Sequence, residues 1–199
     1  VNPAQSGYNA DADGFEATSA DARLVAKLNR DHALTLSLMQ SDTDYQTDTA
    51  IPSGTPNPLG LNKATTDTRS RALTQNTALK WDAQWLPQWT SLVLVGSSEE
   101  QSAQRYLRAS DGALGATGKF NTSRKHLSWQ NDVRFDEDVL TALVEGRSEA
   151  VDSSTVYQQT QRDVTGAMLS YAWNRPVWNA LAVLRNDQNS QFGNFTNWA

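Results

Sequence analysis

The sequence contains no cysteine among its 199 residues and only two histidines. The absence of cysteine excludes a disulfide-stapled domain, a thiol nucleophile and a thiolate metal site. No segment approaches the roughly 18 consecutive apolar residues of a membrane-spanning helix, which excludes a helical-bundle membrane protein. The sequence also begins at Val1 without an initiator methionine or a signal segment, so we expect a piece of a longer chain.

Positive charge is also scarce, and no catalytic motif is present. The net charge is -5 and the isoelectric point is about 5.0, whereas a nucleic-acid-binding protein would carry a basic surface. The sequence lacks G-x-S-x-G, H-E-x-x-H and phosphate-binding glycine motifs, and we expect His32 and His126 to be solvated. We therefore do not expect an enzyme.

The sequence instead shows a two-residue alternation of apolar and polar side chains, without any sustained helical periodicity. Four pairs of alternating segments are joined by short turns: 22–28 with 34–38, 79–85 with 89–95, 124–135 with 140–144, and 167–173 with 178–184. A ninth strand begins near Phe195. The sequence therefore predicts an all-β fold of eight to nine antiparallel up-and-down strands.

The connections at the two ends of these hairpins differ in length and composition. Long polar stretches rich in Thr, Asp, Pro and Gly are expected to form loops at 44–68, 97–117 and 186–194. Aromatic residues such as Trp85, Trp89, Trp173 and Trp178 bracket the short turns. Short turns at one end, long loops at the other and an aromatic girdle are typical of outer-membrane β-barrels.

Two interpretations of this pattern remain open at this point. In a transmembrane barrel, one face of each strand meets lipid and the other lines a wet lumen, which is compatible with a mean hydropathy of -0.59. In a soluble extracellular β-sandwich, the same aromatics would staple hairpin ends or bind carbohydrate on one concave patch. A β-hydrolase is a third, weaker alternative, because the carboxylate pairs show no defensible partner pattern.

Three stretches resemble a known family. Residues 184–193, with the letters LRNDQNSQFG, followed by Thr196 and Trp198, closely resemble a barrel strand and loop of the TonB-dependent outer-membrane receptors, in particular those that carry cobalamin. Residues 9–15 and 67–69 match further segments in the same order. Between these stretches, the resemblance extends over nearly all of 1–199 as a rhythm of strands more than as identical letters.

The resemblance implies that residues 1–199 are the middle part of a receptor barrel in the bacterial outer membrane. Receptors of this family have an N-terminal plug that contacts TonB and a barrel of about 22 strands. The plug and the remaining strands would lie outside this sequence. A segment with two free sheet edges is expected to self-associate or to close into a small barrel. The implied function is active transport of cobalamin or a related scarce nutrient.

An acidic segment near the N-terminus is a candidate calcium site. Asn9, Asp11 and Asp13 place oxygen side chains at two-residue spacing before Gly14, which suits a hard cation. The segment is not an EF-hand loop, because Ala20 stands where the bidentate Glu is required. In the resembled family, calcium ions order the extracellular loops that receive the nutrient, and this acidic loop supplies ligands. The simpler alternative is a solvated acidic loop.

The resemblance also implies partner ligands from a second loop. Tyr45 matches the Tyr of a Tyr-Asp pair, and Asp67 matches a later Asp. Gln46 stands where the Asp of the pair is expected, so we expect weaker calcium binding unless Asp44 or Asp48 substitutes.

The nutrient-contacting residues of the family cannot be matched as closely. Thr47 lies at a loop position where the barrel of such a receptor contacts its ligand, and it is the weak ligand-binding candidate in this sequence. The partners implied by the resemblance are cobalamin or a similar nutrient, calcium, outer-membrane lipid, and TonB acting through the plug of the intact protein.

Overall fold

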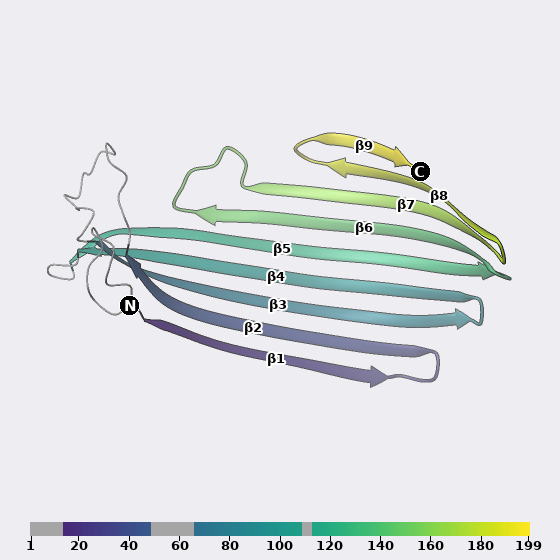
Figure 1. Ribbon diagram of the computed structural model, residues 1–199, viewed down its shortest axis with the longest axis horizontal. Coiled ribbons are helices and arrows are strands. Elements are labelled where there is room, and N and C mark those ends of the chain that lie inside the picture. The colour runs from purple at the N-terminus through teal and green to yellow at the C-terminus, as the bar shows by residue number, and fades with distance from the viewer. Residues whose placement is uncertain (1–13, 49–65, 109–112) are drawn as a thin grey trace.

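The computed structural model describes residues 14–48, 66–108 and 113–199 (Figure 1). These residues form nine strands: β1 (Phe15–Lys27), β2 (His32–Asp48), β3 (Thr66–Leu86), β4 (Trp89–Arg108), β5 (Leu114–Phe135), β6 (Asp138–Ser153), β7 (Gln161–Arg175), β8 (Trp178–Asn189) and β9 (Gly193–Trp198). Among them there is no helix long and apolar enough to cross a membrane.

Each strand pairs antiparallel with the next one in the sequence, so the sheet order is β1 to β9 without a crossover. This arrangement confirms the predicted all-β, up-and-down fold. The described strands form one open, curved layer (Figure 1), and no second sheet packs on it within the described ranges. A sandwich interior is therefore absent from this part of the chain.

The tight turns gather at one end of the sheet and use residues suited to sharp reversals. Asn29 accepts hydrogen bonds from the backbone N–H groups of Asp31 and His32, both at 2.8 Å, which closes the β1–β2 turn. Asp136 has a φ of 55° in the β5–β6 turn, a conformation that Asp tolerates better than most residues. The remaining two turns at this end contain Pro87 and Pro176.

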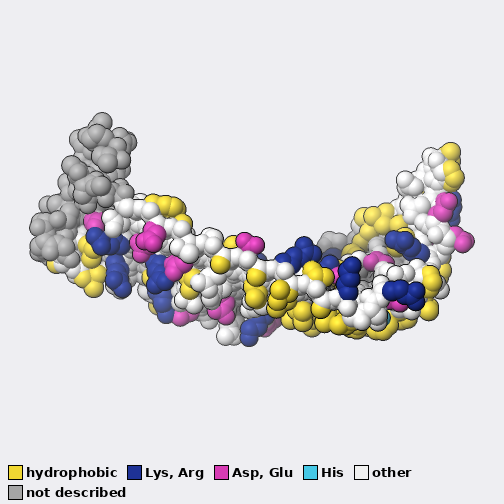
Figure 2. Space-filling view, turned by 90° about the horizontal axis from the view of Figure 1, so that it is seen from below, with side chains coloured by type: hydrophobic (Ala, Val, Ile, Leu, Met, Phe, Trp, Pro, Cys, Tyr) yellow, Lys and Arg dark blue, Asp and Glu magenta, His cyan; other side chains and the backbone are white. Residues whose placement is uncertain are grey.

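One face of the sheet carries an apolar belt next to these turns. From β1 to β9, the apolar belt contains Leu24, Leu36, Leu79, Val95, Leu127, Val144, Leu169, Leu184 and Trp198. In Figure 2, apolar side chains gather along the outward-curving side of the half of the sheet that bears the turns. Leu24 is 62% exposed and Leu127 is 54% exposed, while Ala83 is the one buried hydrophobic residue among those described. The belt therefore lacks a protein layer to cover it.

The tryptophans follow the same face. The register places all seven of them, Trp81, Trp85, Trp89, Trp129, Trp173, Trp178 and Trp198, on the side of the apolar belt. Trp81, Trp85 and Trp89 contact one another at ring separations of 5.6 and 6.1 Å. The tryptophans span β3 to β9 instead of forming one concave patch, and Trp85, Trp89, Trp173 and Trp178 lie beside the tight turns, as in an interfacial girdle.

Three predicted loops are shorter than expected. The prediction of a loop at 97–117 was wrong, because β4 continues to Arg108 and β5 begins at Leu114. At 44–68 the strands occupy 44–48 and 66–68, and at 186–194 only 190–192 separate β8 from β9. Both faces of these strand extensions are polar, so the apolar-polar alternation disappears although the backbone ladder of hydrogen bonds continues.

Candidate functional site

The face opposite the apolar belt carries an arginine cluster, which we define as Arg124, Arg147 and Arg162 around Glu149. Arg124 of β5 pairs in register with Glu149 of β6, which pairs in turn with Arg162 of β7. Arg147 precedes Glu149 by two residues on β6 and therefore faces the same side. Strand register alone thus brings one carboxylate and three guanidinium groups together.

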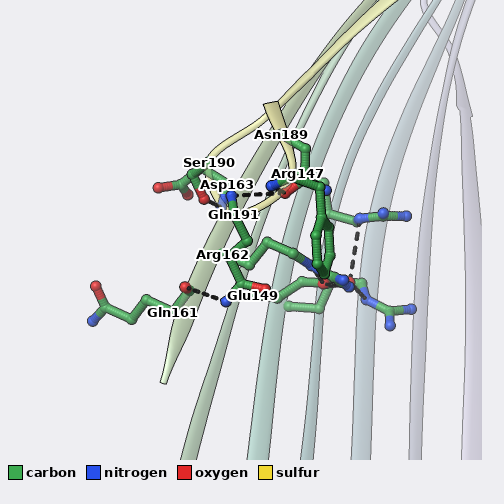
Figure 3. A network of polar contacts seen from close by, with 10 residues as sticks. Arg147, Glu149, Gln161, Arg162, Asp163, Asn189, Ser190 and Gln191 are labelled. Atoms are coloured by element: carbon green, nitrogen blue, oxygen red, sulfur yellow. Dashed lines mark hydrogen bonds and ion pairs between the residues drawn. The ribbon is translucent and has the colours of Figure 1, made fainter. Parts of the chain in front are cut away.

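Both oxygens of Glu149 accept hydrogen bonds in this cluster. Arg124 Nε lies 2.9 Å and Arg147 Nε 3.2 Å from Oε1, while Arg162 Nε lies 2.8 Å from Oε2 and the Arg162 Nη2 also contacts it. Figure 3 shows Arg147 and Arg162 converging on the carboxylate.

A second ion network lies on the same face, closer to the turns. The guanidinium of Arg185 binds both carboxylate oxygens of Asp187, at 2.8 and 2.7 Å, and also contacts Glu145 of β6. The Arg185 side chain lies over Gly166, which pairs with Glu145 on one side and with Asp187 on the other. A Cβ at Gly166 would lie 2.7 Å from Asp187 Oδ1 and 2.9 Å from Arg185 Nη2. A side chain at position 166 would therefore displace the ends of Arg185 and Asp187.

Residues 184–193, which carry the closest family resemblance, form the second half of β8 and the turn into β9. Asn189 Oδ1 accepts hydrogen bonds from the N–H groups of Gln191 and Phe192, at 2.9 and 3.3 Å, and Gly193 has a φ of 81°. Ser190 Oγ accepts a hydrogen bond of 2.9 Å from the Asp163 N–H and ties this turn to β7 (Figure 3). The motif therefore has a local structural role next to the arginine cluster.

The predicted calcium ligands fall partly outside the described residues. Asn9, Asp11 and Asp13 lie there, so calcium binding stays a prediction. Tyr45 pairs with Ser70, and Asp67 lies three positions before Ser70 on β3. Side chains an odd number of positions apart on a strand face opposite sides, so Tyr45 and Asp67 lie on opposite faces of the sheet.

Asp67 already has a partner within the sheet. It is only 8% exposed and lies 3.6 Å from Arg69 Nε. Within the described ranges, no group of three or more His, Asp or Glu side chains is placed to hold a metal ion. Thr47 pairs with Thr68 near the end of β2, and no contact singles it out as a ligand.

Sequence reasoning placed Arg124 on the polar face but missed the rest of the arginine cluster. Glu145, Arg147 and Glu149 continue the two-residue spacing of β6 beyond Val144, where the predicted strand ended. Charged residues at every second position beyond Val144 could therefore have predicted that the strand continues with one charged face. Their partners could not be found this way, because cross-strand contacts depend on the register.

A buried carboxylate at the tight-turn end makes a pH-dependent contribution. Asp138 accepts hydrogen bonds from Tyr171 Oη at 2.9 Å, the Asn174 N–H at 3.1 Å and Arg175 Nη2 at 3.0 Å. The Arg175 hydrogen bond is the main reason that the pKa of Asp138 is lowered to about 2, from an ordinary value of 3.8. Because the folded-state pKa is depressed, the ionised carboxylate stabilises the fold above its ordinary pKa.

We therefore expect this contribution to be lost as the pH falls from about 4 to about 2. Urea unfolding midpoints of the parent chain and of Asp138→Asn should differ most near neutral pH, and the difference should shrink across this window. A difference that persists unchanged below the window would contradict the assignment.

Comparison with known proteins identifies no family. No family model matches the chain, and no curated protein matches it significantly. Among solved structures, the chain is similar to the crystal structure of the Pseudomonas putida toluene transporter TodX, with a TM-score of 0.40 and 9% sequence identity. The match covers 94% of this chain and 60% of that chain, so this chain spans less than two thirds of the matched structure.

Proposed function

We propose that this chain is a segment of an outer-membrane β-barrel transporter. The observation that carries the proposal is the apolar belt, which runs over one face of all nine strands and has no protein layer to cover it within the described residues. Burial of apolar surface contributes about 25 cal/mol per Å², so leaving such a belt in water is strongly unfavourable. Lipid on the belt and water on the opposite face satisfy both sets of side chains.

The position of the belt along the strands supports the same proposal. It lies beside the tight turns, while β3, β4 and β5 continue for many residues beyond it. These extensions are polar, and those of β4 and β5 carry charged side chains on both faces. Outer-membrane barrels have short periplasmic turns and longer extracellular parts. The tight turns are then periplasmic, and the polar extensions of β2 to β5 stand above the membrane.

The proposal extends to the transporter class. Residues 184–193 carry the resemblance to TonB-dependent receptors, and on that basis the intact protein takes up cobalamin or a related nutrient at its extracellular loops. TonB acts through a plug domain of the intact protein, and calcium bound through Asn9, Asp11 and Asp13 orders the loops. No covalent chemistry is part of this function. A soluble sandwich that binds carbohydrate is favoured by no contact among the described residues.

The absence of cysteine makes lipid contact directly testable. Leu79→Cys and Lys80→Cys lie next to each other on β3 and face opposite sides, as do Leu127→Cys and Ser128→Cys on β5. Each variant is labelled with an environment-sensitive fluorophore and reconstituted in phosphatidylcholine vesicles. We expect labels at 79 and 127 to show blue-shifted emission and quenching by brominated acyl chains. Labels at 80 and 128 should instead be quenched by iodide.

The paired design controls for local packing, because each pair shares one strand and one depth. Equal iodide quenching within both pairs would overturn the lipid-facing assignment.

The proposed role of calcium in cobalamin binding is tested on the full-length receptor, where cobalamin affinity should fall when calcium is chelated. Cobalamin binding that is indifferent to chelation would remove the calcium role and leave the barrel assignment intact.

A further inference from the structure

The arginine cluster carries more positive charge than its own carboxylate neutralises. Three guanidinium groups share Glu149, which leaves a local surplus of two positive charges. On the same face, Arg185 holds two carboxylates, Glu145 and Asp187, so that neighbouring network has a net charge of -1 and offsets one charge of this surplus. Glu100 lies on the same face, opposite Thr122, and makes no ion pair with the cluster in the described part of the chain.

The guanidinium groups are open to solvent while their shared carboxylate is covered. The side chains of Arg124 and Arg147 are 60% and 44% exposed, against 15% for Glu149. Both arginines contact Glu149 through Nε, so their terminal nitrogens retain donors that no contact with Glu149 uses. These donors are arranged in planar forks, the geometry that binds phosphate and carboxylate groups bidentately.

A hollow with a volume of about 470 Å³ adjoins the cluster at Arg124. Arg124 and His126 line one side of it, and Asp21 and Arg23 of β1 also line it. Its floor includes the small residues Ser37, Ala78 and Gly96 of β2, β3 and β4, which lie in one register row with His126. His126 Nε2 is covered and has no hydrogen-bond partner among the described residues.

We propose that the arginine cluster is a binding site for a phosphate group on the polar face of the sheet, with Arg124 and Arg147 supplying the terminal donors. The local surplus of two charges matches a phosphate monoester, which carries about -1.5 to -2 at neutral pH. The inference deepens the proposed function, because this face lines the lumen of the proposed transporter and the ligand is then a phosphate-bearing solute.

The test measures binding of inorganic phosphate to the chain folded in a phosphate-free maltoside detergent, by calorimetry in a chloride background. Replacing both Arg124 and Arg147 by Gln should weaken phosphate binding at least about tenfold, because two charge-assisted contacts are lost. Lys80→Gln is the matched control on the same face, since Lys80 is balanced by Asp82 at 2.8 Å. It should leave phosphate affinity unchanged.

A substitution that is expected to strengthen phosphate binding distinguishes a binding role of the cluster from a structural one. Glu149→Gln removes the competing carboxylate and should strengthen phosphate binding several-fold, whereas general damage to the sheet would weaken it. Absence of phosphate binding by the parent chain, acetate binding as tight as phosphate, or weaker binding by Glu149→Gln would each overturn the inference. The fluorophore experiment on residues 79 and 80 is read separately, so failure of phosphate binding with intact lipid contact refutes only this site.

Discussion

Replacing Val93 by arginine is expected to lower the free energy of unfolding in a bilayer by about 2–4 kcal/mol, the cost of a cation near the middle of the lipid-facing band. Val93 lies between Trp81 of β3 and Trp129 of β5 on the face of the apolar belt. An arginine at this depth can neither reach water easily nor find a carboxylate on its own face. Urea unfolding in phosphatidylcholine vesicles, followed by tryptophan emission, measures the loss.

Leu92→Arg is the matched control for this substitution. Leu92 is the preceding residue of β4, but it faces the polar side and pairs with Asp82 and Gln130. We expect a change below about 1 kcal/mol there, because the new cation is solvated and faces a carboxylate. Equal losses for the two variants would mean that both faces are wet, which contradicts the proposed membrane orientation.

The second large effect is expected at Gly166, beneath the Arg185 bridge. Gly166→Val should destabilise the chain by about 1 kcal/mol, because the new side chain displaces Arg185 from Glu145 and Asp187 and partly exposed ion pairs contribute up to about that much. Valine has a higher strand propensity than glycine, so propensity alone would make the variant more stable and cannot explain a loss of stability. Equilibrium unfolding in detergent is the measurement.

Gly146→Val provides the comparison for Gly166. A Cβ at Gly146 meets nothing within 4 Å, and the residue faces the side of the apolar belt between Leu127 and Thr165. We expect unchanged or slightly increased stability there. If Gly146→Val were as damaging as Gly166→Val, the loss at Gly166 could not be assigned to the displaced ion network.

The strands and their faces could be read from the sequence because both depend on local periodicity. The two-residue alternation at 79–85 and 167–173 identified the apolar face before any pairing was known, and turn residues such as Asn29 and Pro87 marked the reversals. This reasoning failed in 97–117, where β4 and β5 continue. A strand with water on both faces carries no alternation, so its length is decided by the neighbouring strand with which it pairs.

For the candidate sites as well, the sequence indicated single residues but not which of them lie together. The sequence predicted Tyr45 and Asp67 as joint ligands, but the register places them on opposite faces of the sheet. The contact of Glu149 with Arg124 joins residues 25 positions apart, and its contact with Arg162 joins residues 13 apart. No local pattern encodes these distances, because loop lengths and strand register decide them.

The sequence by itself determined that the chain is all-β, that it folds by short reversals, and which side chains share a face, since these properties follow from backbone geometry and neighbouring residues. Only the tertiary structure decided that the nine strands form a single layer, that the apolar belt stays uncovered, and that three arginines meet one glutamate. The physical reason is that a one-residue change of register moves every side chain of a strand to the other face.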